Sequence, residues 1–123
     1  MQGTVFPIHF RVFGALTADE YFQFKAPFEL QLIQVDGNAA NTTTCIIDIG
    51  TVADADAYLD NKTLTGATDT PTTWDRDDFV ADSNGVGQYP AIPKDTVVEI
   101  AVDYDGGAGG NVDDLMLTLW FTY

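Results

Sequence analysis

The 123 residues of the chain predict one domain over residues 1–123. The formal net charge is −14, from 19 acidic and 5 basic residues. Such a surface repels phosphate backbones and anionic lipids, so we expect neither a nucleic-acid nor a membrane partner. No segment reaches the ~18 consecutive apolar residues of a membrane span. The N-terminus also lacks the basic region of a signal peptide, so we expect synthesis in the cytosol.

Residues 5–13 alternate between apolar and other side chains, which is typical of a strand. One face would carry Phe6, Ile8, Phe10 and Val12. Pro7 cannot donate a hydrogen bond to a neighbouring strand, so we expect this strand at a sheet edge or at a strand start. Val5 and Phe13 are apolar on the face that should meet water, which indicates a contact there.

Residues 20–35 show the clearest period of two, interrupted at Pro27. The pattern predicts two strands whose core-facing residues are Phe22, Phe24 and Ala26 in the first and Phe28, Leu30 and Leu32 in the second. The phase slips by one residue at Ile33, which indicates a β-bulge or a strand that crosses between two sheets.

Turn-forming residues at 36–41 predict a loop. Residues 44–50 predict the next strand, with Cys45, Ile47 and Ile49 facing inward and Asp48 outward. Cys45 is the only cysteine, so no intramolecular disulfide can form, and we expect it to be a small buried hydrophobe.

The strand pattern is lost over residues 51–73, where we expect a helical turn or a winding loop followed by a polar loop. Residues 73–80 predict a short strand, and residues 88–95 an irregular segment ending in a turn.

Two strong alternating segments follow at residues 96–104 and 113–123, joined by a glycine-rich tip that predicts a mobile hairpin loop. In total the chain predicts an all-β fold, an antiparallel β-sandwich of about seven or eight strands. We expect the core-facing residues of the 20–35 stretch to meet Val98, Ile100, Leu117 and Leu119.

Residues for catalysis are sparse. His9 is the only histidine and has no serine or cysteine motif beside it, so we expect no catalytic residue. Asp54, Asp56 and Asp60 are weak candidates for a Ca²⁺ site, because the spacing of an EF-hand loop is not met. On so acidic a surface the favoured interpretation of Asp54, Asp56 and Asp60 is that they are solvated acids, and we expect Arg76 to pair with a carboxylate beside it.

Exposed apolar side chains are the second set of candidates. Trp120 and Met116 fall on the outer face of the last strand. With Phe13 and Val5 they would form an apolar patch, typical of a partner surface, if the first and last strands are neighbours. The alternative is that residues 51–73 cover them.

Several stretches resemble small proteins encoded in the structural-gene regions of tailed bacteriophages. They are residues 10–35, Leu59-Asp60, residues 74–79 and residues 92–98. The chain is similar to capsid decoration, or cement, proteins with a jelly-roll-like sandwich. This resemblance implies a homotrimer on the exterior of the virion capsid, at local three-fold positions, that clamps subunits of the major capsid protein. It also implies assembly in the host cytoplasm and no cofactor, with Trp120, Met116, Phe13 and Val5 as interface residues.

Two other classes remain open. One is a carbohydrate-binding jelly roll that stacks sugars on Trp74, Tyr89 or Tyr58 and holds Ca²⁺ in an acidic loop. The other is a different virion component, such as a tail or fibre module.

Overall fold

The computed structural model describes residues 3–42, 45–64, 71–104 and 112–123, and within these it contains only strands, turns and irregular segments. The strands are β1 (Val5–Arg11), β2 (Glu20–Lys25), β3 (Leu30–Asn38), β4 (Asn41–Thr42), β5 (Ile46–Thr51), β6 (Leu59–Thr63), β7 (Thr72–Trp74), β8 (Ala91–Ile92), β9 (Val97–Asp103), β10 (Val112–Asp113) and β11 (Met116–Thr122). The described residues contain no helix that could cross a membrane.

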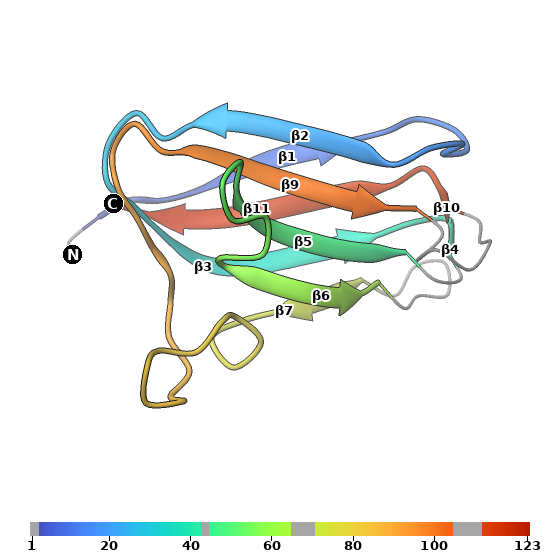
Figure 1. The fold of residues 1–123 in the computed structure, drawn as a ribbon. Helices are drawn as coiled ribbons and strands as arrows, with labels where there is room; N and C mark the ends of the chain where they lie inside the picture. Colours follow the sequence, from blue (N-terminus) through green and yellow to red (C-terminus); the bar gives the residue numbers. More distant parts are fainter. Residues whose placement is uncertain (1–2, 43–44, 65–70, 105–111) are drawn as a thin grey trace.

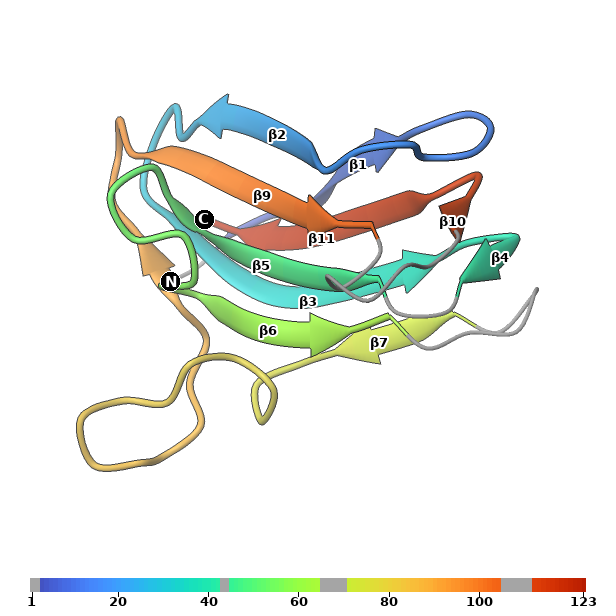
Figure 2. The ribbon, with the colours of Figure 1, turned by 45° about the vertical axis from the view of Figure 1, so that its right-hand side comes forward.

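Two antiparallel sheets lie face to face as a sandwich (Figure 1). The first sheet has the order β1-β11-β3-β7, with β8 beside the start of β3, and the second sheet has the order β2-β9-β5-β6. A turned view shows the same two layers and the small β4–β10 pair at one end (Figure 2). The prediction of an all-β antiparallel sandwich is confirmed.

The chain passes repeatedly from one sheet to the other. β1, β3, β7 and β11 belong to the first sheet, and β2, β5, β6 and β9 to the second. This winding of eight main strands is that of a jelly roll. It also shows that the predicted hairpin between residues 96–104 and 113–123 is wrong, because β9 and β11 lie in different sheets. The glycine-rich tip itself falls outside the described residues.

The core lies between the sheets because the period-two apolar residues of both face inward. Its residues with no exposed surface include Leu30, Leu32, Ile47, Ile49, Val98, Ile100, Leu117, Leu119 and Phe121. The predicted contact between the 20–35 stretch and the two last long strands is therefore confirmed. Cys45 is fully buried, as predicted, and burial raises the pKa of its thiol to about 12.

Two local predictions about strand irregularity are confirmed. β1, which contains Pro7, is an edge strand of the first sheet. The pairing of β11 with β3 shifts at Ile33, because Trp120 pairs with Gln34 while Phe121 pairs with Leu32. The slip in the sequence pattern is therefore a β-bulge, and β3 stays within one sheet.

Three other predictions are wrong. Phe28 was expected in the core but is 40% exposed, because β3 begins only at Leu30 and the Phe28 ring packs on Tyr123 at the end of the sandwich (centroids 4.5 Å apart). Residues 36–38 continue β3 instead of forming a loop, and residues 59–63 form β6 where no strand was expected.

Gly37 explains why turn-forming residues can lie in a strand. It pairs with Leu117 on one side and Thr72 on the other. A Cβ atom at this position would lie 2.8 Å from Cδ1 of Leu64 and 3.3 Å from Cδ2 of Leu117. A glycine is needed where the backbone approaches its neighbours so closely, and pairing on both sides overrides its preference for turns.

Candidate interaction surface

The outer face of the first sheet carries the predicted interface residues. β1 and β11 are neighbours, which was the condition for a shared patch. Trp120 pairs with Pro7, Met116 with Arg11, and Val5 with Thr122. Of residues 51–73, which could have covered this face, residues 51–63 lie instead in the second sheet or in its β5–β6 connection, and residues 72–73 belong to β7 at the edge of the first sheet. Residues 65–70 fall outside the described residues.

The exposure of these residues differs along the face. Phe13 follows the end of β1 and is 77% exposed, with the Arg11 guanidinium 4.5 Å from its ring centroid. Val5 is 52% and Met116 37% exposed, while Trp120 is half-buried. These four residues form two apolar groups at opposite ends of this face. Val5 and Trp120 lie at one end, and Met116 and Phe13 lie at the other.

A polar row separates the two apolar ends. His9 on β1, Thr118 on β11 and Asp36 on β3 stand side by side across the sheet, and Thr73 on β7 continues the row. The His9 ring nitrogen Nδ1 lies 3.0 Å from the Thr118 hydroxyl and is hydrogen-bonded to it. His9 is thus engaged in a contact between neighbouring strands of the sheet.

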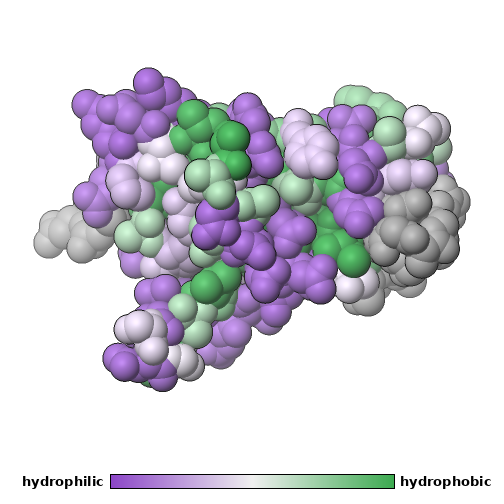
Figure 3. All heavy atoms as spheres, viewed as in Figure 1, coloured by the Kyte–Doolittle hydropathy of each residue, from purple (hydrophilic) through white to green (hydrophobic). Residues whose placement is uncertain are grey.

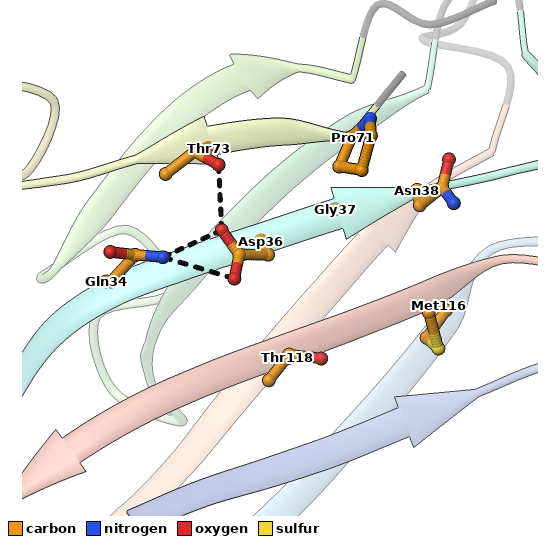
Figure 4. A pocket seen from close by; sticks show the side chains of 8 residues that line it. All are labelled: Gln34, Asp36, Gly37, Asn38, Pro71, Thr73, Met116 and Thr118. Carbon is orange, nitrogen blue, oxygen red and sulfur yellow. Dashed lines mark hydrogen bonds between the residues drawn. The ribbon is translucent and has the colours of Figure 1, made fainter. Parts of the chain in front are cut away.

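The Asp36 carboxylate fixes the Trp120 ring. The indole N–H of Trp120 donates to Oδ2 of Asp36 at 3.1 Å. The same carboxylate accepts from the amide of Gln34 (3.0 and 3.2 Å) and from the Thr73 hydroxyl (2.8 Å), as seen in Figure 4. Since the ring is held before any partner arrives, little side-chain entropy is lost when it is buried in an interface.

A shallow hollow of about 460 Å³ lies beside this network. Its lining, drawn in Figure 4, is Gln34, Asp36, Gly37, Asn38, Pro71, Thr73, Met116 and Thr118. The lining combines the Asp36 carboxylate and neutral hydrogen-bonding groups with the thioether of Met116, so it suits a mixed polar and apolar side chain of a partner. Within the part of the chain that the structure describes, the buried Oδ1 of Asn38 has no hydrogen-bond partner.

The two sheets differ sharply in charge. The strands of the first sheet contain one carboxylate, Asp36, and one permanent cation, Arg11. Those of the second sheet contain five carboxylates and two lysines, at Glu20, Lys25, Asp48, Asp60, Lys62, Glu99 and Asp103. The second sheet faces the viewer in Figure 3, where hydrophilic residues surround scattered apolar patches. On a chain of charge −14, the neutral face is the one that another protein surface can approach without like-charge repulsion.

The acidic loop after β5 offers no ready metal site. The hydrogen bond between Asp54 and Asp56 raises the pKa of the Asp54 carboxyl, and Asp60 lies on β6. Among the residues that the structure describes, no group of three His, Cys, Asp or Glu side chains is placed to hold a metal ion. A Ca²⁺ site at Asp54, Asp56 and Asp60 therefore has no geometric support.

The second acidic cluster stabilises a turn. The backbone N–H of Asp75 donates to the Asp78 carboxylate (3.0 Å), and that of Asp77 donates to Asp75 (3.2 Å). Arg76 pairs with Asp77 at 3.8 Å, which confirms the predicted local pairing.

The predicted sugar-stacking residues do not form a platform. Trp74 is only 5% exposed because it lies on β7 and packs in the core, so its prediction as a stacking residue is wrong. Tyr58 is half-buried against the core, and Tyr89 is 41% exposed in the segment before β8.

Sequence reasoning missed a projecting segment between β7 and β8. It extends away from the sandwich in Figures 1 and 2. Phe79 anchors it in the core, and the Asp82 carboxylate accepts backbone N–H bonds from Asn84 (2.9 Å) and Val86 (3.0 Å). Val86 is 59% exposed, so this ordered segment is a second surface that a partner can contact.

The Asp36 network predicts a measurable link between the face and the fold. Replacing Asp36 by alanine leaves the donors of Gln34, Thr73 and Trp120 without an acceptor, which should lower the free energy of unfolding by about 1–3 kcal/mol. Urea denaturation followed by circular dichroism measures the change. Asp60→Ala removes the same charge from an exposed site and should change stability by less than about 0.5 kcal/mol. Equal losses in both variants would contradict the role of Asp36.

No family model and no curated protein sequence matches the chain. Among solved structures, a chain of the cyanophage Pam1 capsid asymmetric unit superposes with a TM-score of 0.55 at 15% identity, over 98% of this chain and 85% of that chain. A chain of infectious bursal disease virus, Gx strain, aligns with a TM-score of 0.33 at 13% identity, over 99% of this chain and 32% of that one. The first match shows a shared fold over nearly the whole chain, and the second score is too low to establish one.

Proposed function

We propose that the protein is a structural component of a phage capsid, a decoration protein that binds the outside of the head as a homotrimer and stabilises contacts between major capsid subunits. The observation that carries the proposal is the match to a chain of a phage capsid asymmetric unit. That match covers 98% of this chain and 85% of the other, so the two chains have similar sizes and one domain accounts for both. A small chain of this kind suits an accessory capsid role better than that of a whole shell subunit.

The two outer faces fit this role in different ways. The neutral face, with Trp120, Met116, Phe13 and Val5, would contact the neighbouring copies or the capsid surface, where burial of about 800 Å² per partner is usual. The acidic second sheet would face solvent and stay away from packaged DNA. The role requires binding and rigidity but no catalysis, and the fixed Trp120 ring is a suitable anchor.

The direct test mixes the purified protein with undecorated capsids and images them by electron cryomicroscopy. We expect saturable extra density at the local three-fold positions, with three copies per position. Light scattering should give the mass of a trimer before binding. Density on tails or fibres in complete virions, with none on heads, would assign the protein to another virion part. Binding to a glycan array without capsid binding would favour the carbohydrate-binding class.

A further inference from the structure

The free edge of β2 differs from the other sheet edges. In β1 the edge is interrupted by Pro7, in β6 by a register shift against β5 and the positive φ of Asn61 (53°), and β7 has only three residues. Such features prevent strands of other molecules from pairing with an edge. β2 has six residues without proline and pairs with β9 in an unbroken register. Among the described strands it pairs with β9 alone, so its other side presents unpaired backbone groups.

The side chains beside this edge are incompletely covered. Phe22 and Phe24 point into the sandwich but are only half-buried, whereas their β9 partners Ile100 and Val98 have no exposed surface. On the side of β1 these rings meet Phe10, whose ring centroid lies 5.1 Å from that of Phe22 and 6.4 Å from that of Phe24. An added strand at β2 would both complete the backbone ladder and cover these rings.

The sequence of β2 is complementary to itself in one antiparallel register. We propose that β2 pairs with β2 of a second copy of this chain about a two-fold axis at Gln23. Phe22 then lies opposite Phe24 on the core side, and Tyr21 opposite Lys25 on the outer side. A shift of one residue would set Phe22 opposite Gln23 and mix the two faces, so the alternation excludes it. A shift of two residues would either set Phe24 opposite Glu20 or leave only residues 23–25 of the strand paired.

Charge favours a second copy as the occupant. The start of β2 is acidic, with Asp19 and Glu20, and its end is basic, with Lys25. In this register Asp19 of one copy is the diagonal neighbour of Lys25 of the other on the outer side, which gives two attractive contacts for one interface. Lys25 also forms an ion pair of 3.8 Å with Asp95 of its own chain, but both side chains are exposed, so that pair is weak. The aromatic outer partner of Lys25 is Tyr21, 60% exposed in the single chain. The contact is independent of the proposed capsid role and could join two trimers as well as two single chains.

Crosslinking tests the contact directly. In the proposed dimer, Gln23→Cys places the thiols of the two copies opposite each other at the two-fold axis, where opposite Cβ atoms lie about 4.5–5.5 Å apart. The native Cys45 is fully buried with a thiol pKa of about 12, so it should not compete. A short bis-maleimide reagent should give a covalent dimer on a denaturing gel. Thr63→Cys, exposed on the β6 edge of the same sheet, is the matched control. Equal crosslinking of both variants, or none of Gln23→Cys, would overturn the proposal.

Charge reversal tests the register. Lys25→Glu and Asp19→Lys should each weaken self-association roughly ten-fold in sedimentation experiments, because the two-fold axis places each substitution in the interface twice. The double variant restores opposite charges and should recover most of the wild-type association. Failure of the double variant to recover, with all variants folded by circular dichroism, would overturn the pairing. Because these readouts use the isolated protein, they stand whether or not capsids are bound.

Discussion

Replacing Phe121 by alanine is expected to lower the free energy of unfolding by about 3–5 kcal/mol. Phe121 has no exposed surface and lies between the two sheets, with ring centroids 5.8 Å from Phe6 and 5.5 Å from Phe24. It therefore connects β11 to the two edge strands, β1 and β2, whose inward side chains are otherwise half-buried. The truncation removes a large buried ring and leaves a cavity that a close-packed sandwich can only partly close. A loss of this size is a large fraction of the roughly 5–15 kcal/mol that stabilises a typical domain.

Urea denaturation followed by circular dichroism measures this loss by linear extrapolation. Phe13→Ala is the matched control because Phe13 is 77% exposed and contacts only the Arg11 guanidinium among its described ring contacts. It should cost less than about 1 kcal/mol. If Phe121→Ala fails to fold, Phe121→Leu keeps part of the buried surface and should give a smaller, measurable loss. Phe121 variants as stable as Phe13→Ala would contradict this account of the core.

The fold was predictable where one face of a strand is buried in the core and the other is exposed to solvent. The alternation in residues 20–25, 97–103 and 116–122 places each side chain correctly, because a period of two leaves no freedom once one face is buried. The bulge at Ile33 was visible for the same reason, as a change of phase. Pro7 marked its strand as an edge through the missing backbone donor.

The sequence pattern failed where tertiary pairing decides. Gly37 and Asn38 have turn preferences, yet pairing of β3 with β11 and β7 extends the strand to Asn38. The sequence did contain a signal, because small or apolar residues alternate with polar ones from Gln34 to Ala39. In the structure Val35, Gly37 and Ala39 are buried, whereas Gln34, Asp36 and Asn38 are not. The partner of β9 could not be found from sequence, because a glycine-rich connection serves a hairpin or a crossing between sheets equally well.

The candidate surface was predictable in part. The alternation of side chains along the strands placed Trp120, Met116 and Val5 on the outer face. That these residues lie near one another follows only from the pairing of β1 with β11. The Asp36 network was missed because Asp36 was assigned to a loop. A short strand was predicted over residues 73–80, but β7 ends at Trp74, and only its pairing with β3 shows that the Trp74 side chain is buried in the core.

Trp120→Ala is expected to weaken trimer formation or capsid binding by about 2–4 kcal/mol, which is roughly 30-fold or more in affinity. The ring is half-buried in the single chain, and its N–H is fixed by Asp36. Part of its surface thus remains available for a partner at little entropic cost. The fold should persist, because the inward neighbours Leu119 and Phe121 keep their packing in the core.

Trp120→Phe separates the two contributions, since it keeps an aromatic surface but cannot donate to Asp36. We expect it to bind more tightly than Trp120→Ala and less tightly than wild type. Tyr89→Ala is the control, because Tyr89 is 41% exposed on a different part of the molecule and its carbonyl bond from Gln31 survives the change. Binding is measured by cosedimentation with undecorated capsids, and trimer mass by light scattering. If Tyr89→Ala abolishes binding while Trp120→Ala leaves it intact, the contact surface lies at the projecting segment, and the neutral face of the first sheet is not the interface.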